Sequence, residues 1–228
     1  MPEAEGPLVI AAPTDAVLDL LPDAADLLTT LEARRMALLR RVAARRDFLA
    51  AHTLARLCAA RVVRSPHNRL TLVQLCPTCG ANGHGRPSIR EIPALHLSLS
   101  HTPGYVAAVA GWNPIGVDVE RLGRIDVDST VAELLLTPAE RTRMDAAPDR
   151  NRAFLRSWVR KEALVKLGVL SLDALTSADL AGLAITEGPR VTQRWRDLFV
   201  FDWSDATAGT LGAAVGAGVP RLENLIAG

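Results

Sequence analysis

Apolar and polar residues alternate most regularly in the middle of the chain. Leucines occupy every second position of 95–99, and His96, Ser98 and Ser100 stand between and after them. A period of two is typical of a strand with one apolar face and one polar face. The segment 95–100 is therefore predicted to be a strand whose polar face offers hydroxyl and imidazole groups.

The spacing of apolar residues also predicts the other helices and strands. Apolar residues at helical spacing predict helices near 15–28, 31–62, 130–136, 138–147 and 150–167, with one or two amphipathic helices in the second of these ranges. Alternation and short apolar runs predict strands near 8–12, 70–75, 95–100, 105–111, 115–120, 191–203 and 209–217. Two apolar runs on either side of the Gly-Trp-Asn-Pro turn at 111–114 predict a β-hairpin. The fold class expected from this mixture is α+β with antiparallel hairpins.

Composition and charge narrow the classes of function. The chain has 228 residues, 49% of them hydrophobic and 22% charged, which is typical of a folded protein. A net charge of +1 argues against a general nucleic-acid binder. The stretch Arg34 to Arg64 nevertheless holds nine arginines and one acid, Asp47, for a local charge of +8. This stretch is either a solvated helix face or a site for phosphate or an acidic partner.

The chain shows no sign of export. Its first residues carry acids and no base, and its longest uncharged stretch, 206–220, is too short and glycine-rich to span a bilayer. A cytoplasmic protein without a membrane partner is expected. The cysteines Cys58, Cys76 and Cys79 form an odd set that fits a reducing compartment. Cys76 and Cys79 with His84 supply part of a zinc site that only Cys58 could complete, so a glycine-rich loop is the default interpretation.

Lysine is confined to one segment of the chain. The only two lysines are Lys161 and Lys166, in a predicted helix that Asp149 can cap at its start and Gly168 at its end. Glu162 lies between them with mostly apolar residues one turn away on either side, so its carboxylate is expected to be partly buried and to need a cation. That cation is either Lys166, in a helical ion pair, or a metal at a phosphate site.

A pair of acids lies in the strand predicted at 115–120. Side chains alternate along a strand, so Asp118 and Glu120 share a face, with Cα atoms about 6.5–7 Å apart, while Val117 and Val119 face the core. Two carboxylates so close repel each other unless a cation lies between them, and Mg²⁺ prefers such oxygen ligands. The alternative is an ordinary solvated strand face.

The adjacent Ser100 and His101 do not form a hydrolase pair. Neighbours on a strand point to opposite faces, and no G-x-S-x-G elbow surrounds them. Hydrogen bonding to a phosphate suits a hydroxyl and an imidazole better.

Together, these segments resemble the 4′-phosphopantetheinyl transferases of the Sfp type. Gly116-Val-Asp-Val-Glu120 and Trp158-x-x-Lys-Glu-Ala-x-x-Lys166 look like the two signature motifs of that family, and Gly85-Arg-Pro87 and Ser98-Leu-Ser-His101 resemble two accompanying motifs upstream. The four motifs stand in the family's order and run from about residue 85 to residue 168. A single G-x-D-x-E motif is weak, but the ordered set is specific.

The resemblance implies a fold of two similar α/β subdomains related by a pseudo-twofold axis, with the active site between them. The subdomains would be residues 1–114, with the arginine-rich helices and the CoA contacts, and residues 115–228, with the metal ligands and the W-x-x-K-E-A helix. No internal sequence repeat supports this arrangement independently.

The resemblance also implies a reaction and its residues. The phosphopantetheine arm of coenzyme A would pass to a serine of an apo acyl or peptidyl carrier protein, with Mg²⁺ required and 3′,5′-ADP released by a monomeric enzyme. The implied metal ligands are Asp118, Glu120 and Glu162. The implied contacts to CoA are Lys166, His101 and Ser100 at the phosphates, Arg86 and Arg35 near the adenine and 3′-phosphate, and Lys161 in a supporting role. Glu162 and Lys166 are the expected catalytic residues.

Some alternatives remain open at this level. The serine proton could pass to Glu162, to Glu140 or to a metal-bound water. Glu140 also completes a capping box that begins at Thr137, which is a structural role. The chain could instead be a module that binds anions or nucleic acid through its arginines, or an inactive homologue that only binds the carrier protein.

Overall fold

The computed structural model of the chain describes residues 6–76, 79–83, 85–123, 129–185, 188–223 and 225. Its helices are α1 (Thr14–Leu20), α2 (Thr30–Leu38), α3 (Val42–Val63), α4 (Ser129–Leu135), α5 (Pro138–Asp145) and α6 (Arg150–Leu167), with short 3₁₀ turns η1 (Ala24–Leu27), η2 (His67–Arg69) and η3 (Leu172–Ser177). Its strands are β1 (Leu8–Pro13), β2 (Leu72–Leu75), β3 (Arg86–Ile89), β4 (Ile92–Thr102), β5 (Tyr105–Gly111), β6 (Ile115–Arg121), β7 (Arg190–Trp195), β8 (Leu198–Asp205), β9 (Thr210–Gly216) and β10 (Arg221–Glu223). The predicted α+β class is confirmed.

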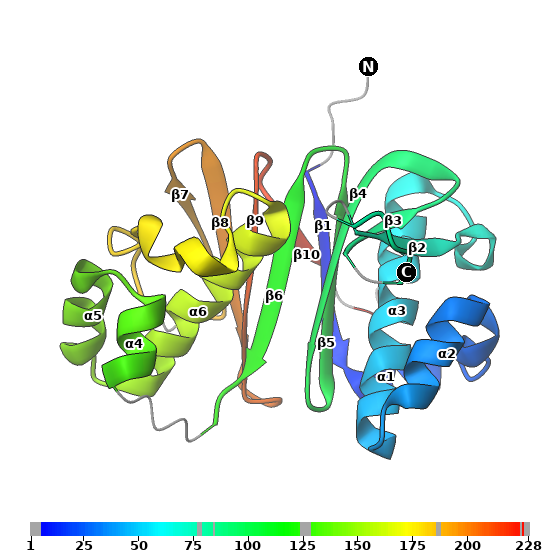
Figure 1. The fold of residues 1–228 in the computed structure, drawn as a ribbon, viewed down its shortest axis with the longest axis horizontal. Helices are drawn as coiled ribbons and strands as arrows, with labels where there is room; N and C mark the ends of the chain where they lie inside the picture. The colour runs from blue at the N-terminus through cyan, green and yellow to red at the C-terminus, as the bar shows by residue number, and fades with distance from the viewer. Residues whose placement is uncertain are drawn as a thin grey trace.

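The strands form two sheets. The first has the order β10-β1-β5-β4-β3-β2 and the second the order β6-β9-β8-β7. Neighbouring strands are antiparallel except β1 and β10, which run parallel. Figure 1 shows α3 with α1 and α2 on one side of the molecule, α6 with α4 and α5 on the other, and the strands between them. Within the described residues, no helix has the length and apolar character needed to cross a membrane.

The hairpin predicted around the turn at 111–114 is wrong. Both edges of β5 are already paired, with β1 and β4, whereas β6 pairs with β9 in the other sheet. The Gly-Trp-Asn-Pro segment therefore carries the chain from one sheet to the next. This change of sheet falls where the two halves were expected to join, although β10 returns to the first sheet.

Other predicted elements also differ from the structure. The range 31–62, predicted to hold one or two helices, holds two, α2 and α3, because the backbone at Leu39 and Arg41 is extended. The strand predicted at 191–203 is the hairpin β7–β8, which turns at Arg196 with a φ of +54°. The strands β3 and β10 were not predicted. Each has only three or four residues, too few for a period to stand out.

The two sheets share a strand order. In the first, β1 lies beside β5 and β5 beside β4, with α3 between β1 and β4 in the sequence. In the second, β6 lies beside β9 and β9 beside β8, with α6 between β6 and β8. This correspondence agrees with two related halves. Their relation by a pseudo-twofold axis stays a prediction.

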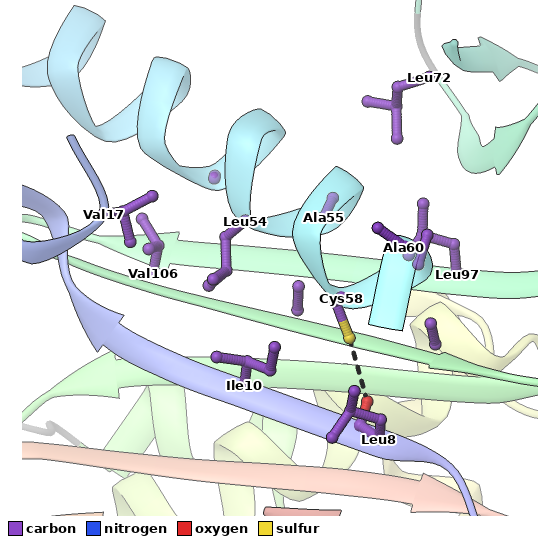
Figure 2. Packing of buried hydrophobic residues seen from close by; sticks show 14 of the residues in the cluster. Leu8, Ile10, Val17, Leu54, Ala55, Cys58, Ala60, Leu72, Leu97 and Val106 are labelled. Atoms are coloured by element: carbon purple, nitrogen blue, oxygen red, sulfur yellow. Dashed lines mark hydrogen bonds between the residues drawn. The ribbon is translucent and has the colours of Figure 1, made fainter. Parts of the chain in front are cut away.

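Helix α3 packs its small and apolar residues on the first sheet. Figure 2 shows Leu54 and Cys58 of this helix directed at Leu8 and Ile10 of β1, and all four side chains are fully buried. The Cys58 thiol donates a hydrogen bond to the Leu8 carbonyl oxygen at 3.2 Å. Cys58 forms no disulfide in the structure.

Helix α6 lies against β6 at Gly116. A Cβ atom at this position would lie 2.0 Å from the Ala163 carbonyl oxygen and 2.6 Å from the Leu167 backbone nitrogen. Because both are backbone atoms of the helix, neither can turn aside. Glycine at this position lets α6 approach β6 closely.

We expect Gly116→Ala to lower the free energy of unfolding by at least about 2 kcal/mol, because the added methyl group overpacks a backbone contact. Urea unfolding measures this change. Gly182→Ala is the control, since a Cβ there meets nothing within 4 Å. Equal stability of the two variants would contradict the role given to Gly116.

Helices α2 and α3 are joined by a buried charge network. The Arg56 guanidinium donates to both carboxylate oxygens of Glu32, at 3.0 and 2.7 Å, and His52 Nδ1 lies 2.7 Å from the same group. On one straight helix, residues 32 and 56 would be about 36 Å apart. The break between α2 and α3 is what allows them to meet.

The Glu32 network predicts a loss of stability in acid. Burial alone raises the pKa of Glu32, but hydrogen bonds from His52 and Arg56 outweigh it and lower the pKa to about 2. The folded state therefore favours the carboxylate, a contribution that is complete above pH 4.5 and is lost as the pH falls toward 2. It amounts to roughly 2–3 kcal/mol. In urea unfolding across this range, Glu32→Gln should be less stable at neutral pH and decline less steeply than the unchanged protein; parallel curves would argue against this.

Candidate active site

Strand β6 presents the acidic pair on one face. Val117 and Val119 are fully buried in the core between the sheets, as predicted. Asp118 and Glu120 therefore share the opposite face, where Asp118 is 4% exposed and Glu120 is half-buried. A charge as deeply buried as that of Asp118 needs partners.

Asp118 has partners from both halves of the molecule. Its Oδ1 accepts a hydrogen bond from Ser100 Oγ of β4 and another from Lys166 Nζ of α6, both at 2.7 Å. Its Oδ2 is buried and has no hydrogen-bond partner among the described residues. One carboxylate oxygen thus remains available for a ligand.

Glu162 lies on α6 one turn before Lys166, half-buried as the sequence predicts. Asp149 caps the start of this helix, and Gly168, with a φ of +87°, ends it. Burial raises the pKa of Glu162, and the charges of Asp118 and Glu120 add to the rise while Lys166 opposes it. Burial and Asp118 likewise raise the pKa of Glu120. The three acids therefore lie within electrostatic reach of one another.

The structure does not gather the three acids into a finished metal cage. Across the described parts of the chain, no group of three or more His, Cys, Asp or Glu side chains lies close enough to hold a metal ion. The donor set still fits Mg²⁺, which commonly takes one or two carboxylates and completes its shell with water and substrate phosphate. The unpartnered Oδ2 of Asp118 and the mutual repulsion of the acids are the features that a cation would relieve.

Strand β4 turns a row of hydroxyl groups toward β6. Ser98 Oγ accepts from the Val117 amide at 3.2 Å, and further along the strand the hydroxyls of Ser100 and Thr102 donate to the two acids of β6. All three hydroxyl residues are buried. These contacts join the first sheet to the second.

His101 lies on the opposite face of β4 and is exposed. Partial removal of water by the surrounding protein lowers the pKa of its imidazole, and Lys166 and His52 act in the same direction. Asp47 and Asp118 oppose them. His101 thus lies within electrostatic reach of residues from both halves.

A cavity of about 390 Å³ lies between strands β2, β3 and β4 and helix α6. Its lining comes from the first half and from α6: Gln74, Gly85, Arg86, Pro87, Ser98, Leu99, Val165 and Lys166. The Arg86 guanidinium donates to the Leu167 carbonyl oxygen at the end of α6, at 3.1 Å. Arg86 and Lys166 give this cavity two cationic walls, which suits an anionic ligand.

Arg35 lines a neighbouring cavity of about 250 Å³ on α2. Its guanidinium donates to Gln74 Oε1 and lies 5.4 Å from the centre of the Phe48 ring. Gln74 lines both cavities, so the cavity that contains Arg35 borders the cavity that contains Arg86. Gln74 was not predicted from the sequence, because it belongs to no motif. Ser98 was part of the Ser98-Leu-Ser-His101 motif but was not assigned to a ligand.

The nine arginines of 34–64 divide into several environments. Arg56 is fully buried against Glu32, Arg46 pairs with Asp15 at 2.7 Å, and Arg61 donates to the Leu225 carbonyl oxygen. Arg34, Arg40, Arg41 and Arg45 are exposed. Arg35 alone among the nine lines one of the two cavities described here.

Lys161 and Glu140 do not lie in this cavity. Lys161 is fully buried, and its ammonium lies 2.7 Å from Glu140 Oε2 and 2.8 Å from the Leu175 carbonyl oxygen. Glu140 also accepts from the amides of Thr137, in the predicted capping box, and of Leu180. This geometry gives the pair a structural role, so a contact of Lys161 with CoA has no support in the structure.

The described residues do not complete the partial zinc motif of Cys76 and Cys79. Cys58 is buried in the core under β1, and His84 lies outside the described residues. Cys58 therefore cannot join Cys76 and Cys79 as a ligand.

Comparison with known proteins bears on the second half of the chain. Residues 114–211 match the model of the 4′-phosphopantetheinyl transferase superfamily. This segment is similar to the members of that superfamily. It contains Asp118, Glu120, Glu162 and Lys166, so the resemblance seen in the two signature motifs is confirmed.

Three curated transferases are similar over part of their length. The chain is 34% identical over 87 residues to 4′-phosphopantetheinyl transferase psf-1 of Bacillus pumilus, and 30% identical over 91 residues to a 4′-phosphopantetheinyl transferase of Bacillus subtilis. It is 28% identical over 88 residues to the transferase ffp of Bacillus subtilis. Each match covers 37–38% of this chain and 36–39% of the relative. The chain thus spans little more than a third of the length of these transferases.

We expect Glu140→Gln to destabilise the fold by about 3–5 kcal/mol, because it leaves the Lys161 ammonium buried without its counter-charge. Thermal and urea unfolding measure the loss. Replacing both residues, as Glu140→Gln with Lys161→Met, should recover part of it. A fully stable Glu140→Gln protein would contradict the structural role.

Proposed function

We propose that this chain transfers the 4′-phosphopantetheine arm of coenzyme A to a serine of an apo acyl or peptidyl carrier protein, in the presence of Mg²⁺, and releases 3′,5′-ADP. One observation carries the proposal. The cavity walled by Arg86 and Lys166 adjoins the acids Asp118, Glu120 and Glu162 through the Lys166–Asp118 ion pair. The superfamily match over 114–211 supports the same reaction.

The cavity has the chemistry that CoA requires. CoA carries several phosphate groups, and charged guanidinium and ammonium donors bind phosphate strongly. Lys166 and Arg86 line the cavity with the Ser98 hydroxyl, and His101 lies near Lys166. Arg35, across Gln74, is placed to meet a ligand that extends into the second cavity. We assign these residues to the binding of CoA.

We assign Asp118, Glu120 and Glu162 to the Mg²⁺ ion. When bound, the ion would offset negative charge on the pyrophosphate during transfer. Asp118 is held by Ser100 and Lys166 through Oδ1, which leaves Oδ2 for this role. Lys166 adds a positive charge beside the same group and so stabilises a polyanionic ligand.

Glu162 is our choice for the general base. The serine oxygen forms a bond to the β-phosphorus of CoA, the bond from that phosphorus to the 3′,5′-ADP oxygen breaks, and the serine proton passes to a carboxylate. Glu162 suits this step by its place, since it is half-buried on α6 one turn before Lys166, which lines the cavity. Glu140 is committed to Lys161 and to backbone amides, so it is not suited to this step.

The test is a transfer assay with CoA, Mg²⁺ and a panel of apo carrier proteins. Mass spectrometry should show the phosphopantetheine arm on the carrier serine. Asp118→Asn should slow this addition at least about a hundredfold, because it removes a charge from the metal site. Asp197→Asn, in the exposed turn between β7 and β8, is the matched control and should react normally.

Two results would overturn the proposal. No addition to any carrier would favour a protein that only binds anions or carrier protein. Full activity of Asp118→Asn would show that the reaction does not need the Asp118 carboxylate. Circular dichroism and thermal melting of each variant separate these outcomes from a failure to fold.

A further inference from the structure

Thr102 is the last residue of β4, and its side chain is 3% exposed. Its Oγ1 donates a hydrogen bond to Glu120 Oε2 at 3.1 Å. The two residues belong to different sheets, so no backbone pairing fixes one relative to the other. The hydrogen bond between the two side chains therefore fixes the Glu120 carboxylate relative to Thr102.

The turn that carries Thr102 is held from several directions. The Gly104 amide donates to Asp47 Oδ1 of α3 at 3.1 Å, and the Gly104 carbonyl accepts from the Thr14 amide at 2.9 Å. From the other sheet, the Arg121 guanidinium donates to the Pro103 carbonyl oxygen at 3.0 Å. Thr102 is therefore a donor whose position is fixed before any ligand arrives.

Glu120 needs such support. It is half-buried, lies next to the last residue of β6, and has the like charge of Asp118 on the same face. Repulsion between the two carboxylates favours turning Glu120 outward to solvent, and the bond from Thr102 opposes that movement. Ser100 does the same for Asp118, at 2.7 Å.

From this geometry we infer that Thr102 is a positioning residue for metal binding, which holds the Glu120 carboxylate on the side of β6 where Asp118 lies. The inference rests on the proposed function. Thr102 does not touch the reacting atoms. It restricts the rotation of a ligand, and removing such an outer partner typically weakens metal binding 10- to 100-fold.

The experiment measures Mn²⁺ binding to the folded protein by electron paramagnetic resonance, with CoA present and no carrier protein. Thr102→Val, which removes the hydroxyl and keeps the shape, should weaken binding about tenfold or more. Thr102→Ser keeps the hydroxyl and should bind within about threefold of the unchanged protein, in line with the usual scatter of such contributions. In the transfer assay, the half-saturating Mg²⁺ concentration should rise for Thr102→Val while kcat recovers at high Mg²⁺.

Thr53→Val is the matched control. Thr53 is fully buried in α3, and its hydroxyl has no hydrogen-bond partner within the described chain. This variant should bind Mn²⁺ normally. If Thr102→Val does not fold, as judged by thermal melting, Thr102→Ala is compared with Thr102→Ser in the same way.

The outcomes separate this inference from the proposed function. If the unchanged protein transfers the arm and Thr102→Val binds Mn²⁺ within about twofold of it, the inference is wrong and the function stands. Failure of Thr102→Ser to restore binding would also overturn it, because the hydroxyl would then not be the cause. If the unchanged protein transfers nothing, the proposed function fails first.

Discussion

The contact between β4 and β6 is the constraint on which the site depends. These strands belong to different sheets, so side chains connect them where backbone pairing does not. Three hydroxyl groups, from Ser98, Ser100 and Thr102, reach the β6 backbone, Asp118 and Glu120 in turn. Each buried hydroxyl thereby gains a partner, and two buried or half-buried acids are oriented without being neutralised. The same row of hydrogen bonds joins the two sheets and orients the carboxylates of Asp118 and Glu120.

Helix α6 places its buried ion-pair residues and the residues of the candidate site on different faces by its period. Arg156, Arg160 and Lys161 are buried and bond to carbonyl oxygens and to the acids Asp202 and Glu140, as part of the packing of the second half. Glu162 and Lys166, four residues apart, lie on a half-exposed stripe toward β6. The side chains of adjacent residues are about 100° apart around a helix axis, so Lys161 and Glu162 face different surroundings. The close approach at Gly116 brings that stripe to Asp118.

Much of the fold and of the acidic site could be predicted because local periodicity encodes it. The alternation in 115–120 fixes which side chains of β6 face the core, and the helical period of 150–167, with its cap at Asp149 and its end at Gly168, places Glu162 beside Lys166. The hairpin expected at 111–114 failed for a different reason. Strand pairing is a choice among partners far apart in sequence, and β5 takes β1 and β4 while β6 takes β9.

The sequence by itself determined the class of the elements, the shared face of Asp118 and Glu120, and the motifs that point to phosphopantetheine transfer. Only the tertiary structure decided that Lys161 is a buried partner of Glu140, that Gln74 separates two cavities, and that Thr102 holds Glu120. The physical reason is distance along the chain. Faces and caps follow from residues within a few positions of one another, whereas buried ion pairs and cross-sheet hydrogen bonds join residues 18 or more positions apart.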